Sequence, residues 1–144
     1  MSCSFTQKYG LYFAWLIALL ALMGSLYSSV ILHLPVCDLC WYQRVCIYPL
    51  VIILGIATYR HDLAIIKYAI PLAILGALFA LYQYLEQMIP GFSPLALCSP
   101  TGPDCSHIHF KWLGFITYPF ISLIACVGII FFLLSARGAR NHLQ

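Results

Sequence analysis

Four long apolar stretches run through the chain, and the charged residues between them mark where each stretch begins and ends. Residues 11–34 carry no formal charge, and these 24 residues would form about 36 Å of helix, enough for a hydrocarbon core of about 30 Å. This stretch is longer than the apolar segment of a cleaved signal peptide, so we expect it to be retained as a span. Residues 68–85 and 112–136 add 18 and 25 uncharged residues, and both are predicted to cross a membrane.

The remaining apolar stretch is shorter and has a cation beside it. Residues 45–59 number only 15, so the predicted span 41–59 must include the interfacial aromatic residues Trp41 and Tyr42 and admit Arg44 near its end. An arginine in that position costs a few kcal/mol unless it is paired or reaches the interface. The pattern therefore leaves two possibilities for Arg44, a partner within the protein or contact with lipid headgroups.

The composition indicates that lipid is the solvent for most of this chain. Hydrophobic residues make up 63% and charged residues only 8%, against about 25% charged residues in an ordinary soluble domain. The net charge is +3, and the basic residues are scattered rather than clustered, which argues against a nucleic-acid partner. We therefore predict an all-α fold, an integral membrane four-helix bundle in which residues 1–144 form a single four-span domain.

The lysine and arginine positions predict the orientation, because short loops rich in these residues stay on the cytoplasmic side. With the N-terminus inside, five cations lie in cytoplasmic segments and two lie outside. The inner five are Lys8, Arg60, Lys67, Arg137 and Arg140, and the outer two are Arg44 and Lys111. The expected topology is N-in and C-in, with the loops at 35–43 and 86–111 on the exterior.

This topology sorts the seven cysteines by compartment. Cys3 is expected on the cytoplasmic side, whereas Cys46 and Cys126 fall inside spans, where a thiol behaves as a small apolar group. The other four lie in the exterior loops, where disulfides can persist. These are Cys37, Cys40, Cys98 and Cys105.

The first exterior pair lies where the second span is expected to begin. Pro35 marks the preceding turn and Asp38 is a candidate N-cap, so Cys40 should lie in the first helical turn. The helix N-terminus favours the reactive thiolate form of cysteine, and Arg44 lies four residues on, on the same face. The arrangement of Cys37, Cys40 and Arg44 indicates redox chemistry. A metal site is the alternative for the two cysteines.

The second exterior pair, Cys98 and Cys105, encloses six residues that include two prolines and a glycine, and such a loop is readily closed by a disulfide. By itself this pair would be interpreted as a structural staple. Two dithiol pairs on one face suggest a relay, in which an external protein thiol reduces the loop disulfide and the loop then exchanges with the first pair. A zinc site that includes His107 and His109 is the alternative.

Such a relay needs a final electron acceptor that can be reached from lipid. The chain contains no haem-attachment CxxCH, no nucleotide-binding fingerprint and no pair of histidines at helical spacing inside a span, so nothing points to a fixed redox cofactor. A diffusible quinone fits best. Arg44 would suit a quinone carbonyl, which becomes an oxyanion on reduction. This interpretation requires no metal.

Several motifs outside the first cysteine pair belong to the same pattern. They are Ser25-Leu26-Tyr27, Tyr48-Pro49-Leu50, the Cys98/Cys105 loop and Trp112-Leu113-Gly114-Phe115-Ile116-Thr117. With the run Cys37-x-x-Cys40-Trp41-Tyr42-Gln43-Arg44, these segments resemble the DsbB/BdbC family of quinone-linked disulfide-formation membrane proteins, in particular its BdbC branch. The resemblance covers nearly the whole chain.

The resemblance implies a quinone-dependent protein-disulfide oxidoreductase of the bacterial cytoplasmic (inner) membrane. It would reoxidise an exported DsbA-like thioredoxin-fold thiol oxidase and pass the electrons to ubiquinone or menaquinone. By resemblance, Cys37 and Cys40 are the quinone-proximal pair, with Cys40 the thiolate that contacts the ring and Arg44 a residue that helps hold it. Cys98 and Cys105 would face the partner. Their short separation leaves open which is attacked first, and Cys98 is favoured.

Overall fold

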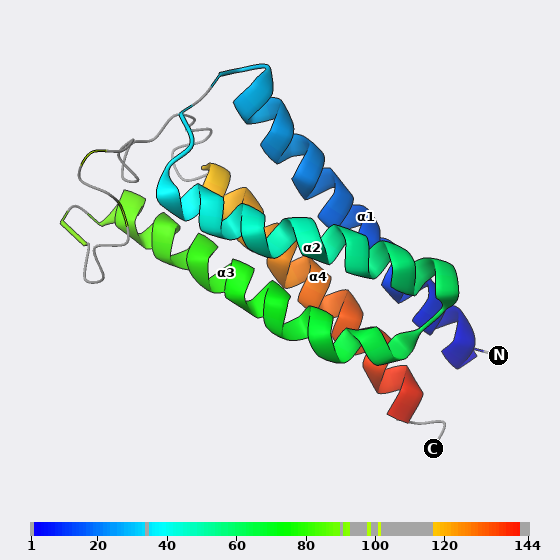
Figure 1. Cartoon of the computed structure of the whole chain (residues 1–144). Coiled ribbons are helices and arrows are strands. Elements are labelled where there is room, and N and C mark those ends of the chain that lie inside the picture. The colour runs from blue at the N-terminus through cyan, green and yellow to red at the C-terminus, as the bar shows by residue number, and fades with distance from the viewer. Residues whose placement is uncertain are drawn as a thin grey trace.

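The computed structural model describes residues 2–33, 35–89, 91–92, 98, 101 and 117–141. These residues form four long helices and one turn of 3₁₀ helix. The elements are α1 (Ser2–Val30), α2 (Asp38–Arg60), η1 (Leu63–Ile65), α3 (Ile66–Met88) and α4 (Tyr118–Asn141). Figure 1 shows both termini at one end of the bundle and the connection from α1 to α2 at the other end. The prediction of an all-α four-helix bundle is confirmed.

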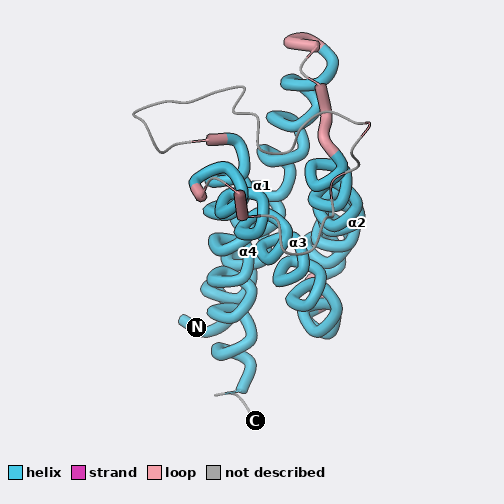
Figure 2. Tube along the Cα trace, turned by 90° about the vertical axis from the view of Figure 1, so that its left-hand side faces the viewer, coloured by secondary structure: helices cyan, strands magenta, loops and turns pink. Residues whose placement is uncertain are grey.

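The four helices close into a ring. Helix α1 packs against α2 and α4, and α3 packs against the same two helices. Figure 2, turned by 90° from the first view, shows the same arrangement and places the turn between α2 and α3 at the end that holds the termini. The α1–α2 connection therefore lies at the same end as the C-terminus of α3 and the N-terminus of α4.

All four helices are long and apolar enough to cross a membrane. The candidate spans are Gln7–Val30, Asp38–Arg60, Leu63–Met88 and Tyr118–Gly138. Large apolar side chains cover their outer surfaces, and Val45, Ile52 and Phe131 are each 64% exposed. An exterior of this kind is expected where lipid surrounds the bundle, because a helix satisfies its own backbone hydrogen bonds and needs no water.

Small residues allow the helices to approach one another closely. Ala14 and Ala18 of α1 are fully buried, and they pack in a core with Leu54 of α2 and Ile129 of α4. At Gly10 of α1, an added Cβ would lie 3.2 Å from a backbone carbonyl oxygen of α4. Small side chains at helix contacts are typical of membrane bundles, where close packing rather than the hydrophobic effect holds helices together.

The helix ends differ from the bounds of the predicted spans, most of all at the start of α1. Helix α1 begins at Ser2 rather than near residue 11, because Lys8 ends the apolar pattern but does not end the helix. Helix α4 begins at Tyr118, and residues 112–116, which the apolar pattern assigns to the same span, lie outside the described part of the chain.

Candidate functional site

Cys37 and Cys40 meet where α2 begins. Both are free thiols, and their Sγ atoms are 2.9 Å apart. Cys40 lies in the first turn of α2, as the sequence predicts. The prediction that Asp38 caps this helix was wrong, because the N-cap is Cys37, whose backbone is extended (φ −76°, ψ 165°). The Cys37 carbonyl accepts a hydrogen bond from the Trp41 N–H at 3.2 Å, and Asp38 is the first helical residue.

The two thiols differ in their surroundings. Cys37 is only 5% exposed. Its hydrogen bond with Cys40 and its burial both raise the pKa of the Cys37 thiol above its usual range. Cys37 therefore tends to keep its proton, and negative charge on the reduced pair is favoured on Cys40, at the helix N-terminus.

Two glutamines from different helices form a hydrogen-bonded pair beside the sulfur atoms, and one of them, Gln83, contacts both sulfurs. Nε2 of Gln83, from α3, lies 3.2 Å from Cys37 Sγ and 3.3 Å from Cys40 Sγ. Oε1 of Gln83 accepts a hydrogen bond from Nε2 of Gln43, from α2, at 2.7 Å. The two glutamines are 3% and 7% exposed. Sulfur and amide atoms thus form a buried polar cluster inside an apolar bundle.

Arg44 has a partner within the protein. Its Nε donates to Ser25 Oγ of α1 at 2.9 Å, and its Nη2 donates to the Ser25 carbonyl oxygen at 3.0 Å. The guanidinium also lies over the Trp41 ring, 5.6 Å from its centroid. These contacts offset the free-energy cost of placing the Arg44 guanidinium at the edge of a span. Its hydrogen bonds run to α1, not to Cys40 one helical turn away.

A cavity of about 460 Å³ lies beside the two thiols and is lined by all four helices. Cys40, Gln43 and Arg44 line it from α2, and Ser25 lines it from α1. Apolar side chains such as Ile47 complete the wall. The cavity falls in the size range of ligand sites, and its mixture of apolar walls with a few polar groups is typical of them.

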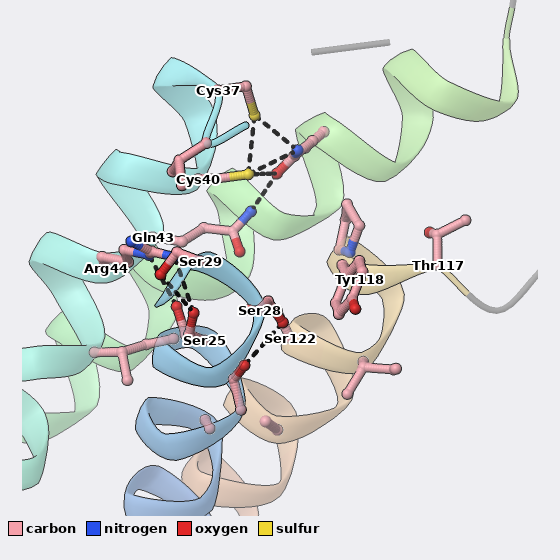
Figure 3. A pocket seen from close by; sticks show the side chains of 18 of the residues that line it. Ser25, Ser28, Ser29, Cys37, Cys40, Gln43, Arg44, Thr117, Tyr118 and Ser122 are labelled. Atoms are coloured by element: carbon pink, nitrogen blue, oxygen red, sulfur yellow. Dashed lines mark hydrogen bonds between the residues drawn. The ribbon is translucent and has the colours of Figure 1, made fainter. Parts of the chain in front are cut away.

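The Thr117 hydroxyl, in the wall of the cavity, is buried without a hydrogen-bond partner among the described residues. Thr117, just before α4, is 1% exposed, and its Oγ1 makes no hydrogen bond. Figure 3 shows Thr117 across from Cys37 and Cys40, on the α4 side. A buried hydroxyl with no partner costs about 1–3 kcal/mol, so a polar group bound in the cavity would relieve that cost.

Cys98 packs near the first cysteine pair, at the start of α2. It is disulfide-bonded, and it packs on the buried cluster formed by Cys37 and Leu39. Its Sγ is also 3.9 Å from Oε2 of Glu86, near the end of α3. The structure thus brings one member of the second predicted pair to the first. Cys105, its predicted partner, lies outside the described residues.

The two histidines of the alternative zinc site, His107 and His109, also lie outside the described residues. Within the part of the chain that is described, no group of three or more His, Cys, Asp and Glu side chains is placed to hold a metal ion.

Comparison with known proteins accounts for this combination of fold and cysteines. A family model described as "Disulfide bond formation protein DsbB" matches residues 7–136. The chain belongs to the DsbB family. It is thus a multi-pass membrane protein of disulfide bond formation, and membership of the DsbB family implies oxidoreductase activity.

Individual relatives agree with this assignment to the DsbB family. A "Probable disulfide formation protein" of Coxiella burnetii (strain CbuK_Q154) is 61% identical over 130 residues, which cover 90% of this chain and 88% of the relative. The "Disulfide bond formation protein C" of Bacillus subtilis (strain 168) is 48% identical, with 92% and 95% covered, which confirms the resemblance to the BdbC branch. A "Probable disulfide formation protein" of Chlamydia muridarum (strain MoPn / Nigg) is 44% identical, with 93% and 96% covered. No solved structure matches the chain.

Two further cysteines of this DsbB-family chain lie apart from the site. Cys46 and Cys126 are buried free thiols, from α2 and α4. An added Cβ at Gly76 of α3 would lie 3.3 Å from Cys126 Sγ and 3.5 Å from Cys46 Cβ, so the glycine leaves room for both. They fill the core as small side chains, in keeping with the sequence prediction.

Sequence reasoning assigned no role to Gln83, and it named Gln43 and Thr117 only as members of motifs. A signal for Gln83 was present, because a glutamine inside an otherwise apolar span usually faces other helices and hydrogen-bonds across them. Its partner could not be inferred from the sequence, since Gln43 and Gln83 are 40 residues apart and meet only through the packing of α2 on α3.

Proposed function

We propose that this DsbB-family protein is a thiol-disulfide oxidoreductase that reoxidises an exported DsbA-like thiol oxidase and passes the electrons to membrane quinone. It would thereby sustain disulfide formation in exported proteins. The observation that carries this proposal is the pair of thiols 2.9 Å apart beside a ligand-sized cavity, with the disulfide-bonded Cys98 packed on the cluster of Cys37 and Leu39. A structural staple or an isolated metal site would need no such cavity.

We further propose that the chain forms one domain in the bacterial cytoplasmic membrane, with both termini inside and the cysteine loops on the extracytoplasmic side. The excess of lysine and arginine in the predicted inner segments supports this orientation. The bundle supports it as well, since both termini and the turn between α2 and α3 lie at one end, and the start of α2 lies at the other.

In the proposed relay, the partner's two thiols become a disulfide while the Cys98–Cys105 disulfide becomes two thiols. Internal exchange then passes two electrons onward, so that Cys98 and Cys105 return to a disulfide and a Cys37–Cys40 disulfide is reduced. A disulfide-bonded Cys98 beside two free thiols corresponds to the stage after this exchange. The contact between Cys98 and the Cys37 cluster supports a direct transfer.

The residues around the cavity fit a quinone. Arg44 would hold a ring oxygen on the α2 side, and the Thr117 hydroxyl, which has no partner among the described residues, would offer a second hydrogen bond on the α4 side. A bound quinone would supply the capacity to accept two electrons and two protons. Cys40, which lines the same cavity, would present its sulfur to the ring. Ubiquinone and menaquinone share this ring chemistry. The experiment below compares the two as electron acceptors.

The test uses the purified full-length chain in detergent micelles with a reduced DsbA-like partner and each quinone in turn. We expect quinone reduction coupled to partner oxidation, and we expect Cys40→Ser to abolish it. Cys126→Ala is the matched control, because Cys126 is buried in the core away from the cavity, and this variant should keep its turnover. Undiminished turnover by Cys40→Ser would refute the mechanism, and four exterior thiols released by a chelator would favour the zinc alternative.

A further inference from the structure

The side-chain amide of Gln83 has an unusual set of contacts. Both sulfur atoms of the first pair lie within hydrogen-bond distance of its Nε2, Cys37 Sγ at 3.2 Å and Cys40 Sγ at 3.3 Å. The side chain is 3% exposed, so water does not compete for its donors. An amide nitrogen carries two hydrogens, and here one is available for each sulfur.

Gln43 fixes which end of the amide faces the thiols. Its Nε2 donates to Gln83 Oε1 at 2.7 Å, the shortest of the hydrogen bonds in this cluster. Because the carbonyl end is held by this donor, the NH₂ end of Gln83 is turned to the sulfur atoms. Gln83 Oε1 also lies 3.8 Å from Cys40 Sγ. When Cys40 is protonated, its S–H can donate a weak hydrogen bond to this oxygen.

This geometry favours one redox state of the pair over the other. A disulfide sulfur is a weak acceptor, whereas a thiolate is charged, and hydrogen bonds to charged groups are about twice as strong as neutral ones. Two N–H donors held at the sulfur atoms therefore stabilise the reduced, thiolate-bearing pair more than the disulfide. Two charged side chains of these helices contact other groups, since Arg44 bonds to Ser25 and Glu86 Oε2 lies 3.9 Å from Cys98 Sγ.

We propose that Gln83 is a catalytic residue of the Cys37–Cys40 pair, which stabilises the Cys40 thiolate and so makes the Cys37–Cys40 disulfide more oxidising, and that Gln43 is the positioning residue that orients it. The half-reaction is the Cys37–Cys40 disulfide plus two electrons and one proton, giving the Cys37 thiol and the Cys40 thiolate. A disulfide whose reduced form is stabilised is a stronger oxidant. This inference rests on the proposed function, in which the pair accepts electrons from Cys98 and Cys105.

The experiment equilibrates the full-length chain in micelles with glutathione buffers and measures the oxidised fraction of the Cys37–Cys40 peptide by mass spectrometry. Gln83→Leu should make reduction of the pair about tenfold less favourable, which corresponds to a potential about 30 mV more negative. Gln83→Glu, which keeps the shape but replaces the donors with a carboxylate, should have at least as large an effect. Gln43→Leu should shift the equilibrium in the same direction but less.

Tyr84→Phe is the matched control, because it removes a polar group from the next residue of α3, whose ring packs on Phe120 and not on the sulfur atoms. Its potential should equal that of the wild type. A second readout is the rate at which iodoacetamide alkylates Cys40 at pH 7 in the reduced protein. The Gln83 variants should react about tenfold more slowly, and Tyr84→Phe should react at the wild-type rate.

A purely structural role for Gln83 would lower thermal stability but leave the potential and the alkylation rate unchanged, and that result would overturn the proposal. If Gln83→Leu does not fold, the near-isosteric Gln83→Glu and the more distant Gln43→Leu still decide between the two outcomes. The measurement uses neither quinone nor a protein partner. Its failure is therefore distinguishable from failure of the proposed function, which depends on both.

Discussion

The hydrogen bond between Arg44 and Ser25 gives a prediction about stability that can be worked from distances. Ser25→Ala removes the oxygen that accepts from Arg44 Nε at 2.9 Å, but it leaves the bond from Nη2 to the backbone carbonyl oxygen at 3.0 Å. A hydrogen bond to a charged group contributes about 1.5–3 kcal/mol in soluble proteins, while interhelical bonds in membranes average about 0.6 and reach about 1.7 kcal/mol. We expect Ser25→Ala to lower the free energy of unfolding by about 1 kcal/mol.

The chain supplies a matched control on the same helix. Among the described residues, Ser28 donates to the Gly24 carbonyl oxygen of its own helix, at 2.9 Å, so Ser28→Ala should change stability by less than about 0.5 kcal/mol. Both variants can be unfolded in mixed micelles with increasing SDS, followed by tryptophan fluorescence. A double-mutant cycle with Arg44→Met should give a coupling energy of about 1 kcal/mol. Equal stabilities of the two serine variants, or no coupling to Arg44, would refute the assignment of Ser25 as its anchor.

Two further predictions concern helix packing and the cavity. Alanine is favoured over glycine in a helix by about 1 kcal/mol, so Gly24→Ala, with nothing within 4 Å of the new Cβ, should stabilise the protein. Gly10→Ala would place its Cβ 3.2 Å from the Phe132 carbonyl oxygen. This variant should be less stable than Gly24→Ala by about 1–3 kcal/mol in the same SDS assay. Equal stabilities of the two variants would contradict the close packing of α1 on α4. Thr117→Val should raise stability by about 1 kcal/mol because it removes a buried hydroxyl that has no hydrogen-bond partner in the described part of the chain. It should also weaken quinone binding about fivefold, measured by fluorescence quenching, and unchanged affinity would exclude Thr117 from the ligand site.

The helices could be predicted from the sequence because each apolar run is long and bounded by charges. The apolar run does not mark where α1 itself begins, since Lys8 interrupts the apolar pattern while the backbone continues as helix. Asp38 has the usual chemistry of an N-cap, but the extended backbone lies at Cys37. Local chemistry therefore located the start of α2 to within one residue. The backbone dihedral angles of the folded chain show that the N-cap is Cys37.

Only the contacts between residues close in sequence could be predicted for the site. The proximity of Cys37 to Cys40 follows from their separation by two residues at a helix start. The partner of Arg44 and the contact of Gln83 with the sulfur atoms depend on how α1 and α3 pack against α2, which no spacing along the chain specifies. The burial of Thr117 beside the cavity is likewise a product of tertiary packing.

The central claim is that electrons leave this protein from the Cys37–Cys40 pair, and a single-turnover reaction tests it most directly. The full-length chain, with Cys37 and Cys40 reduced, is mixed anaerobically with one equivalent of quinone, and the products are mapped by mass spectrometry. We predict one quinol formed for each new Cys37–Cys40 disulfide, with Cys46 and Cys126 still free. Unreacted quinone, or quinol formed while Cys37 and Cys40 remain thiols, would contradict the account.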